Sequence, residues 1–284
     1  MTVGRPVRRV PGWRRLWRHS YALGLTWLAR EARHGWPGRR VGLARLLVPL
    51  DPWRYYELGR TADEEFAGAC LDVSSPKLLP SLLQAEGKGR WVCIDLFDDE
   101  IAAWRAVDPE LELDVQDATA LPFADASFDH CACISVLEHI GAGKDSVALA
   151  ELWRVLKPGG VLHLTTDVAI SPKDVYVADK VYGSASEAVS GRGVFFKHDY
   201  SPAEVERLVA ERPWHVDHRE YAVQRNPDIE RRFYAYAPWS YVLGPFLRLV
   251  CPGNFDTAAS TALIERAGSG VVSLRLRKPA ETSR

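Results

Sequence analysis

The sequence predicts an α/β protein with a doubly wound, mostly parallel sheet of seven strands. Three observations support this class. Short apolar runs alternate with helical segments from residue 69 onward, acidic residues follow several of these runs, and 284 residues are enough for one large domain. Strands separated by helices of this length pair in parallel through right-handed crossovers. We also expect a helical N-terminal extension and two insertions, one after the fifth strand and one between the last two strands.

The expected elements follow one another with recognisable start and stop signals. Apolar, β-branched runs predict strands, and periodic segments that begin with an acid or proline predict helices. The predicted strands are 69–73, 90–96, 111–115, 128–135, 161–167, 214–223 and 270–279. The predicted helices are 76–87, interrupted by Pro80, 98–108, 144–157 and 201–213. Gly159 and Gly160 predict a tight turn before the fifth strand.

The chain divides into an extension, residues 1–50, and a domain, residues 51–284, whose insertions cover about 170–200 and 226–266. The extension holds eleven Arg, no Lys and one acid, Glu31. Its aromatic and leucine residues have helical spacing and predict a basic amphipathic helix. Such a helix can pack on the protein or a second copy, lie on an anionic membrane, or contact phosphates, and the sequence leaves these three readings open.

Composition excludes several classes. The net charge of −1 gives no overall attraction to nucleic acid, so a nucleic-acid partner is not expected. Four of the five Cys lie in predicted buried strands, which favours a reducing compartment, no disulfide framework and no metal site. No apolar run is long enough to span a bilayer, and no secretory signal is evident. We expect a cytoplasmic protein, with membrane association through the N-terminal helix left open and the oligomeric state undetermined.

Three carboxylates lie at the carboxyl ends of consecutive predicted strands, where ligands bind in open parallel sheets. Asp72 closes the first strand, Asp95 closes the second and Asp117 follows the third. With the strand order of residues 69–168, this set resembles the class I S-adenosylmethionine-dependent methyltransferases. The resemblance implies the Rossmann-like methyltransferase fold and S-adenosylmethionine as the cofactor.

The resemblance also implies a role for each residue. Asp72 would lie near the amino group of the methionine moiety, Asp95 would accept hydrogen bonds from the ribose hydroxyls, and Asp117 with the Ala118 backbone would hold the adenine amino group. Ser135 would line the floor of the methionine pocket. Ser74, Ser75 and Leu96 complete the expected cofactor-binding set. The alternative for Asp72 and Asp117 is the capping of a helix or turn.

The loop after the first strand departs from the family pattern. It reads Ser74, Ser75, Pro76 where the family usually has glycines that let the backbone approach the cofactor. The same lack of glycine disfavours a nicotinamide cofactor, which requires a G-x-G-x-x-G turn for its pyrophosphate. The departure also supports an alternative in which the fold has lost activity and serves as a binding or scaffold protein.

Methyl transfer by in-line displacement needs alignment and one proton acceptor. His139 is the first candidate for this base, since a neutral imidazole can accept a hydroxyl proton, and His198 and Tyr200 are further catalytic candidates. Aromatic residues of the insertions could wall a pocket for a small-molecule or lipid-like acceptor, methylated at oxygen: Tyr176, Tyr182, Phe195, Phe196, Phe233, Tyr234, Tyr236, Trp239 and Tyr241. An RNA methyltransferase that uses the Arg-rich front as an anchor is a weaker alternative.

Overall fold

The computed structural model describes residues 12–31, 35–141, 143–178, 188–189, 193–237 and 239–280. Tyr182 lies outside them. The described strands are β1 (Ala69–Val73), β2 (Arg90–Asp95), β3 (Glu112–Val115), β4 (Phe128–Ile134), β5 (Leu156–Ala169), β6 (Lys173–Val177), β7 (Ala188–Val189), β8 (Gly193–Asp199), β9 (His215–Gln224), β10 (Phe255–Ala258) and β11 (Ser269–Arg277). The described α-helices are α1 (Trp13–Glu31), α2 (Arg39–Leu47), α3 (Arg54–Thr61), α4 (Leu78–Ala85), α5 (Asp98–Val107), α6 (Lys144–Val155), α7 (Pro202–Ala210), α8 (Asp228–Ala235) and α9 (Ala262–Ala267). The described 3₁₀ helices are η1 (Leu137–His139), η2 (Trp239–Leu249) and η3 (Cys251–Gly253).

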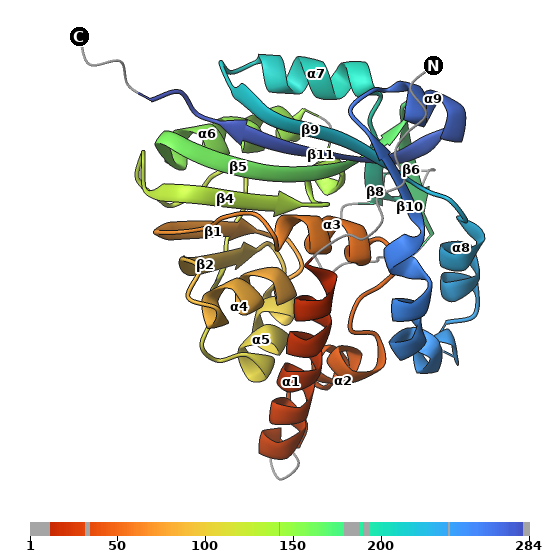
Figure 1. Cartoon of the computed structure of the whole chain (residues 1–284). Helices are drawn as coiled ribbons and strands as arrows, with labels where there is room; N and C mark the ends of the chain where they lie inside the picture. Colours follow the sequence, from red (N-terminus) through yellow and green to blue (C-terminus); the bar gives the residue numbers. More distant parts are fainter. Residues whose placement is uncertain are drawn as a thin grey trace.

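The central sheet has the order β10-β9-β11-β5-β4-β1-β2-β3 (Figure 1). β3, β2, β1, β4 and β5 pair in parallel, whereas β11 runs antiparallel to both β5 and β9. The order reverses between β1 and β4, so the carboxyl ends of these two strands flank the position where such sheets bind ligands. The described sheet contains one strand more than the seven predicted, because β10, within the second insertion, pairs with β9.

Two apolar cores lie on opposite faces of the sheet. One contains side chains of α1, α3, α4 and α5, and the other contains side chains of α6, α7 and α9. All five cysteines are free and buried, as expected of small apolar residues inside strands. Because both faces are covered, polar groups of the central strands reach the surface only at the strand ends.

The fifth strand begins earlier than the sequence indicates. β5 starts at Leu156, and Gly159 and Gly160, predicted to form a turn, lie inside it at an irregularity of the pairing. Phe128 pairs with Leu156 and His130 with Val161. Gly159 supplies the bend with a φ of 81°. A bulge of this kind uses the same small residues as a turn, so the pattern could not distinguish the two.

The first insertion, which reads as a loop in the sequence, contains a small antiparallel sheet of order β6-β8-β7. It is attached to the central sheet where Val168 bridges to Tyr200 and the Ala169 N–H donates to the Tyr200 carbonyl over 2.7 Å. The attachment holds β8 beside the carboxyl end of β5.

The N-terminal helix α1 packs on the protein itself. Its buried residues include Leu16, Ser20, Gly24 and Trp27, and they lie along one face that contacts α2, α3, α4 and α5. Gly42 of α2 lies against the Trp27 ring, where even a methyl group would come within 2.2 Å. The apolar face that the sequence offered to a membrane is therefore covered by protein. No helix among the described residues is long and apolar enough to cross a bilayer.

Candidate functional site

Asp72 of β1 and Asp95 of β2 come together at the carboxyl edge of the sheet, around a lysine that sequence reasoning missed. The Lys77 Nζ lies 2.9 Å from Asp72 Oδ2 and 3.3 Å from Asp95 Oδ2, and it donates to the Ser75 carbonyl over 2.9 Å. Lys77 and Asp72 are almost fully buried, and Asp95 is nearly so. We call Asp72, Asp95 and Lys77 the buried charge triad.

The charged groups of the triad affect one another's pKa values. Burial raises the pKa of Asp72 to about 6, although the Lys77 ammonium opposes that shift. Burial alone would lower the pKa of Lys77, but the two carboxylates outweigh it and raise the pKa. Lys77 therefore stays charged at neutral pH and compensates the charge of Asp72.

The glycine-free loop of Ser74, Ser75 and Pro76 turns toward the protein interior and places Lys77 beside the two acids. Ser74 adopts a φ of 50°, in the left-handed region that favours glycine. Ser75 is buried, and its Oγ accepts a hydrogen bond from the Ile134 N–H over 2.8 Å, which ties the loop to the end of β4. Pro76 follows, and Lys77 precedes α4. The positive φ at Ser74 marks the place where the family glycine was expected.

The predicted adenine-binding residues lie at the end of β3 and are more exposed. Asp117 is exposed and caps its own turn, because its Oδ1 accepts hydrogen bonds from the Thr119 N–H (2.8 Å) and Oγ1 (2.7 Å). Leu96 is 45% exposed and Ala118 is partly buried. The contacts of Asp117 are therefore those of a turn cap, the alternative given above. Within the described residues, Lys77 pairs with Asp72 and Asp95 and not with Asp117.

Ser135, at the end of β4, connects the site to a third buried acid. Its φ is 55°, and its Oγ donates to Glu138 Oε1 over 2.8 Å. Glu138 Oε2 accepts from Thr166 Oγ1 over 2.8 Å. Burial raises the pKa of Glu138, and Asp167 and Glu57 raise it further by repulsion. The end of β4 therefore holds a carboxyl group that favours its neutral form.

Glu57 of α3 enters the same region from outside the central sheet. Its Oε1 accepts from Thr165 Oγ1 over 3.0 Å, and its Oε2 lies 2.5 Å from Arg54 Nη1. Burial raises the pKa of Glu57 to about 7, against the attraction of Arg54. The sequence signal for Glu57 is weak, because a lone acid in a short helix is indistinguishable from a surface residue before its burial is known.

His139 lies in η1, beside the insertion. Its Nδ1 is 2.7 Å from the Phe196 carbonyl, which can only accept, so the proton is on Nδ1 and Nε2 is the unprotonated nitrogen. Burial lowers the pKa of His139, although the carbonyl contact opposes the shift. The structure therefore presents His139 as a neutral imidazole at the carboxyl edge of the sheet.

His198 and Tyr200 have other contacts. His198 Nδ1 is 2.8 Å from Asp174 Oδ1 within the small sheet, and Tyr200 donates to Asp145 Oδ2 over 2.9 Å and to the Leu137 carbonyl over 3.2 Å. Tyr200 is buried, and burial with the nearby Asp145 carboxylate raises its pKa. The observed contacts give Tyr200 a structural role in attaching the insertion.

The aromatic residues predicted to wall a pocket, as far as they lie within the described ranges, do not form one group. Tyr176 and Phe195 face each other in the small sheet, and Phe233 packs against Tyr241. Tyr236 and Trp239 are 67% and 82% exposed. Phe196 contacts His139, the candidate base, with ring centroids 4.9 Å apart.

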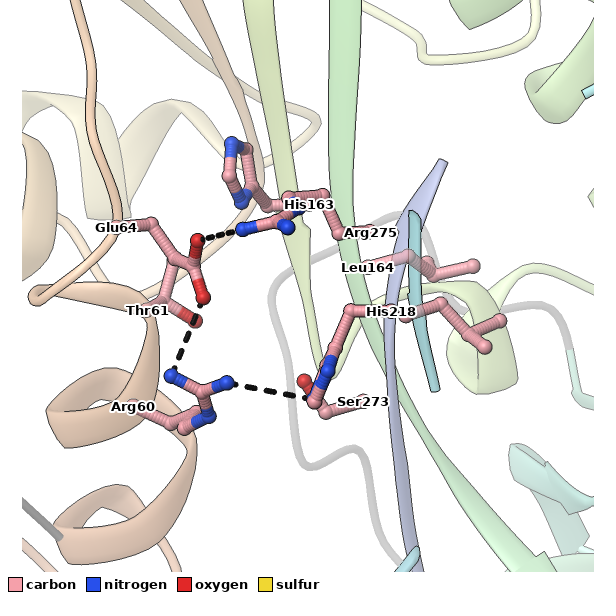
Figure 2. Close-up of a pocket in the computed structure, with 9 residues that line it drawn as sticks. Arg60, Thr61, Glu64, His163, Leu164, His218, Ser273 and Arg275 are labelled. Atoms are coloured by element: carbon pink, nitrogen blue, oxygen red, sulfur yellow. Dashed lines mark hydrogen bonds and ion pairs between the residues drawn. The ribbon is translucent and has the colours of Figure 1, made fainter. Parts of the chain in front are cut away.

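A small polar cavity lies elsewhere, between α3 and the strands β5, β9 and β11 (Figure 2). On its wall, Arg60 and Arg275 both form ion pairs with Glu64, at 3.2 and 2.5 Å. The volume of the cavity is about 10 Å³. His163 on its wall is buried, and burial lowers its pKa well below the ordinary value. A space of this size holds about one water, so the cavity is structural.

Comparison with known proteins identifies the central segment. Residues 71–164 match the sequence model of a family described as "Methyltransferase domain". A curated demethylmenaquinone methyltransferase from Renibacterium salmoninarum is 48% identical over 102 residues, 36% of this chain. The chain covers 35% of the length of that curated relative.

One solved structure extends the likeness to most of the fold. A SAM-dependent methyltransferase from Methanosarcina mazei aligns with a TM-score of 0.51 and 17% identity, over 82% of this chain and 100% of the other. One from Mesorhizobium loti aligns with a TM-score of 0.48 and 14% identity, over 79% and 97%. The first alignment confirms the predicted fold class, and the family match confirms the resemblance over residues 71–164.

We predict that Ser74→Gly stabilises the protein. Glycine adopts a φ of 50° without the cost of roughly 1–2 kcal/mol that an L side chain meets there, while its greater freedom in the unfolded chain offsets part of the gain. The free energy of unfolding in urea should rise by about 0.5–1 kcal/mol. Ser75→Gly is the matched control, and it should destabilise the protein because it loses the Ile134 hydrogen bond. A Ser74→Gly protein less stable than wild type would contradict the strain argument.

We predict that Lys77→Met is strongly destabilising. Removing the ammonium leaves Asp72 and Asp95 buried without a cation, which costs about 3–5 kcal/mol in urea unfolding. Adding Asp72→Asn should recover at least about 1 kcal/mol, because it removes one uncompensated charge. Lys157→Met, which breaks a half-exposed pair with Asp129, should cost less than about 1 kcal/mol. Equal losses from the two lysine variants would refute a buried role for Lys77.

We predict that Glu138→Gln changes the pH dependence of stability. A carboxyl whose pKa is raised on folding favours the folded state most below its ordinary value of 4.5, and this contribution is lost as the pH rises toward the raised pKa. The unfolding free energy of the variant, relative to wild type, should therefore increase from pH 5 to pH 8, by at most about 1.4 kcal/mol per pH unit. The exposed Glu112→Gln control should differ from wild type by the same amount at both pH values.

Proposed function

We propose that this chain, whose residues 71–164 belong to a methyltransferase domain family, is an S-adenosylmethionine-dependent methyltransferase. The acceptor we propose is a small-molecule or lipid-like compound, methylated at oxygen. The observation that carries the proposal is the meeting of Asp72 and Asp95 at the carboxyl edge of a methyltransferase-type sheet, beside its reversal point.

The hydrogen-bonding groups at this edge fit the cofactor in their chemistry. Asp95 ends β2, and within the described residues its carboxylate has long contacts of 3.3 Å, from Lys77 Nζ and from the Phe97 N–H, so it keeps acceptor capacity for two ribose hydroxyls. Leu96, Asp117 and Ala118 follow along the same edge and offer a partly exposed surface for the adenine. When bound, the cofactor supplies a methyl group on a positively charged sulfur.

The ion pair with Lys77 lowers the share of cofactor recognition that we assign to Asp72. The family pattern brings a cationic amino group near this carboxylate, but Lys77 already compensates its charge at 2.9 Å. A second cation would gain less there than beside an uncompensated acid. We therefore assign most of the cofactor recognition to Asp95, with Ser74, Ser75 and Ser135 as the neighbouring backbone and hydroxyl groups, and a smaller share to Asp72.

His139 is the residue that we propose as the general base. Its neutral state and its unprotonated Nε2 suit it to accept a proton from a hydroxyl group, which favours oxygen as the methylated atom. Phe196, in contact with the imidazole, supplies apolar surface for the acceptor beside it. His198 remains a second proposal for the base, with its Nδ1 beside Asp174.

A second candidate function is a binding protein that uses the fold without transferring a methyl group. The observation that favours it is the position of Lys77. Its ammonium already lies beside Asp72 and Asp95, where a cofactor amino group would otherwise approach. In this reading, the loop of Ser74, Ser75 and Pro76 closes the site instead of admitting a ligand. The two functions differ in whether the protein binds the cofactor or its demethylated product.

We predict that Asp95→Asn weakens binding of S-adenosylhomocysteine by about 10- to 100-fold in calorimetry at neutral pH, because hydrogen bonds to a charged acceptor contribute about 1.5–3 kcal/mol. Asp72→Asn should weaken it by less. Asp99→Asn, on an exposed acid at the start of α5, is the matched control and should bind as wild type. Thermal melts of each variant establish that it is folded. Absence of heat with the wild-type protein would favour the binding-protein alternative, and equal affinities would refute the role of Asp95.

A further inference from the structure

The outward face of η2 carries large apolar side chains that no described element covers. Trp239 is 82% exposed, Leu249 73% and Val242 63%, and the other members have comparable exposure. We call these residues the η2 surface: Trp239, Val242, Leu243, Phe246, Leu249 and Val250. Several large apolar side chains exposed on one short segment favour an interaction site there.

The orientation of η2 is fixed by its other face. Ser240, Gly244 and Leu247 are buried, and the Ser240 hydroxyl donates to the Phe233 carbonyl. Gly244 lies so close to the Leu47 carbonyl of α2 that a methyl group there would come within 2.1 Å. The segment cannot rotate its large apolar residues inward without losing this close packing, so their exposure is a property of the fold.

Basic residues and further apolar residues border the η2 surface. Arg248 lies over the Trp17 ring, 4.7 Å from its centroid, which joins η2 to α1. On α2, Leu43 and Leu47 are exposed by about two-fifths. Figure 1 shows α8 and α2 on the same side of the molecule as the segment that leads into β10.

Arginines outnumber acids on η2, α1 and α2, whereas α8 carries two acids, Asp228 and Glu230, beside its two arginines. The chain contains three Arg and no acid between Glu230 and Asp256. On α2, Arg40 pairs with Glu100 and Arg45 lies over the Trp104 ring, which leaves Arg39 as the remaining basic residue of that helix. Before Glu31, α1 contains four Arg and no acid. An apolar surface with aromatic residues, bordered by arginines, is complementary to a lipid bilayer with anionic head groups. A second copy of this chain would bring like charges together and fits less well.

We propose that the η2 surface docks this protein on anionic lipid membranes. Trp239, Leu243 and Phe246 enter the interface between head groups and acyl chains, and Arg248 contacts the phosphates. This site differs from the N-terminal helix that the sequence offered for membrane contact, because the apolar face of α1 is buried. The proposal does not depend on methyltransferase activity.

Vesicle co-sedimentation of the full-length chain tests the proposal. We expect binding to vesicles of equal parts phosphatidylcholine and phosphatidylglycerol, and at least about tenfold weaker binding to pure phosphatidylcholine or at high salt. The double variant Leu243→Gln/Phe246→Gln should bind anionic vesicles at least about tenfold more weakly. Arg248→Gln should reduce the preference for anionic lipid.

The matched control is Val147→Gln/Val216→Gln, which removes two exposed apolar residues from α6 and β9, outside the η2 surface. It should bind as wild type, and thermal melts should show all variants folded. Wild-type protein that ignores both kinds of vesicle would overturn the proposal, as would equal binding by the two double variants. Light scattering that finds a wild-type dimer and a monomeric Leu243→Gln/Phe246→Gln variant would assign the surface to a second copy instead.

Discussion

A single buried ammonium holds together the carboxyl ends of the two strands that define the site. Lys77 lies within 3.3 Å of both Asp72 and Asp95, and without it two acids of adjacent strands would be buried side by side with no cation. Burying an unpaired charge costs far more than one hydrogen bond returns. The loop after β1 accepts a left-handed serine to bring the lysine into place, so the local strain at Ser74 follows from this electrostatic requirement.

Much of the sheet could be predicted because its signals are local. The bounds of β1 are those expected, and β2, β4 and α5 end within one residue of their predicted ends. The parallel pairing of the first five strands also follows from local patterns, since strands that alternate with helices are joined by crossover connections. Asp72 and Asp95 could be brought together in advance for the same reason: parallel neighbours end at one edge.

The partners of those acids could not be predicted, because they depend on tertiary burial. Lys77 stands in a segment with helical periodicity, where a lysine is expected on the solvated face. Glu57 reaches Thr165 across more than a hundred residues of sequence, and its raised pKa exists only once α3 covers the end of β5. Likewise, the periodicity of residues 13–30 predicts a helix but not whether protein or lipid covers its apolar face, and β10 joins the sheet from a segment with no clear strand pattern.

The buried charge triad and the η2 surface depart from the usual burial of side chains in opposite ways. At the carboxyl edge of the sheet, charged groups are buried and compensated by one another, whereas at η2 large apolar groups are exposed and lack compensation within the described residues. Natural sequences retain such a local conflict where function offsets its cost. The buried conflict suits recognition of a charged, hydroxyl-rich ligand at Asp95, and the exposed one suits an apolar phase outside the protein. An acceptor that is itself lipid-like would satisfy both, because it would be found where η2 docks.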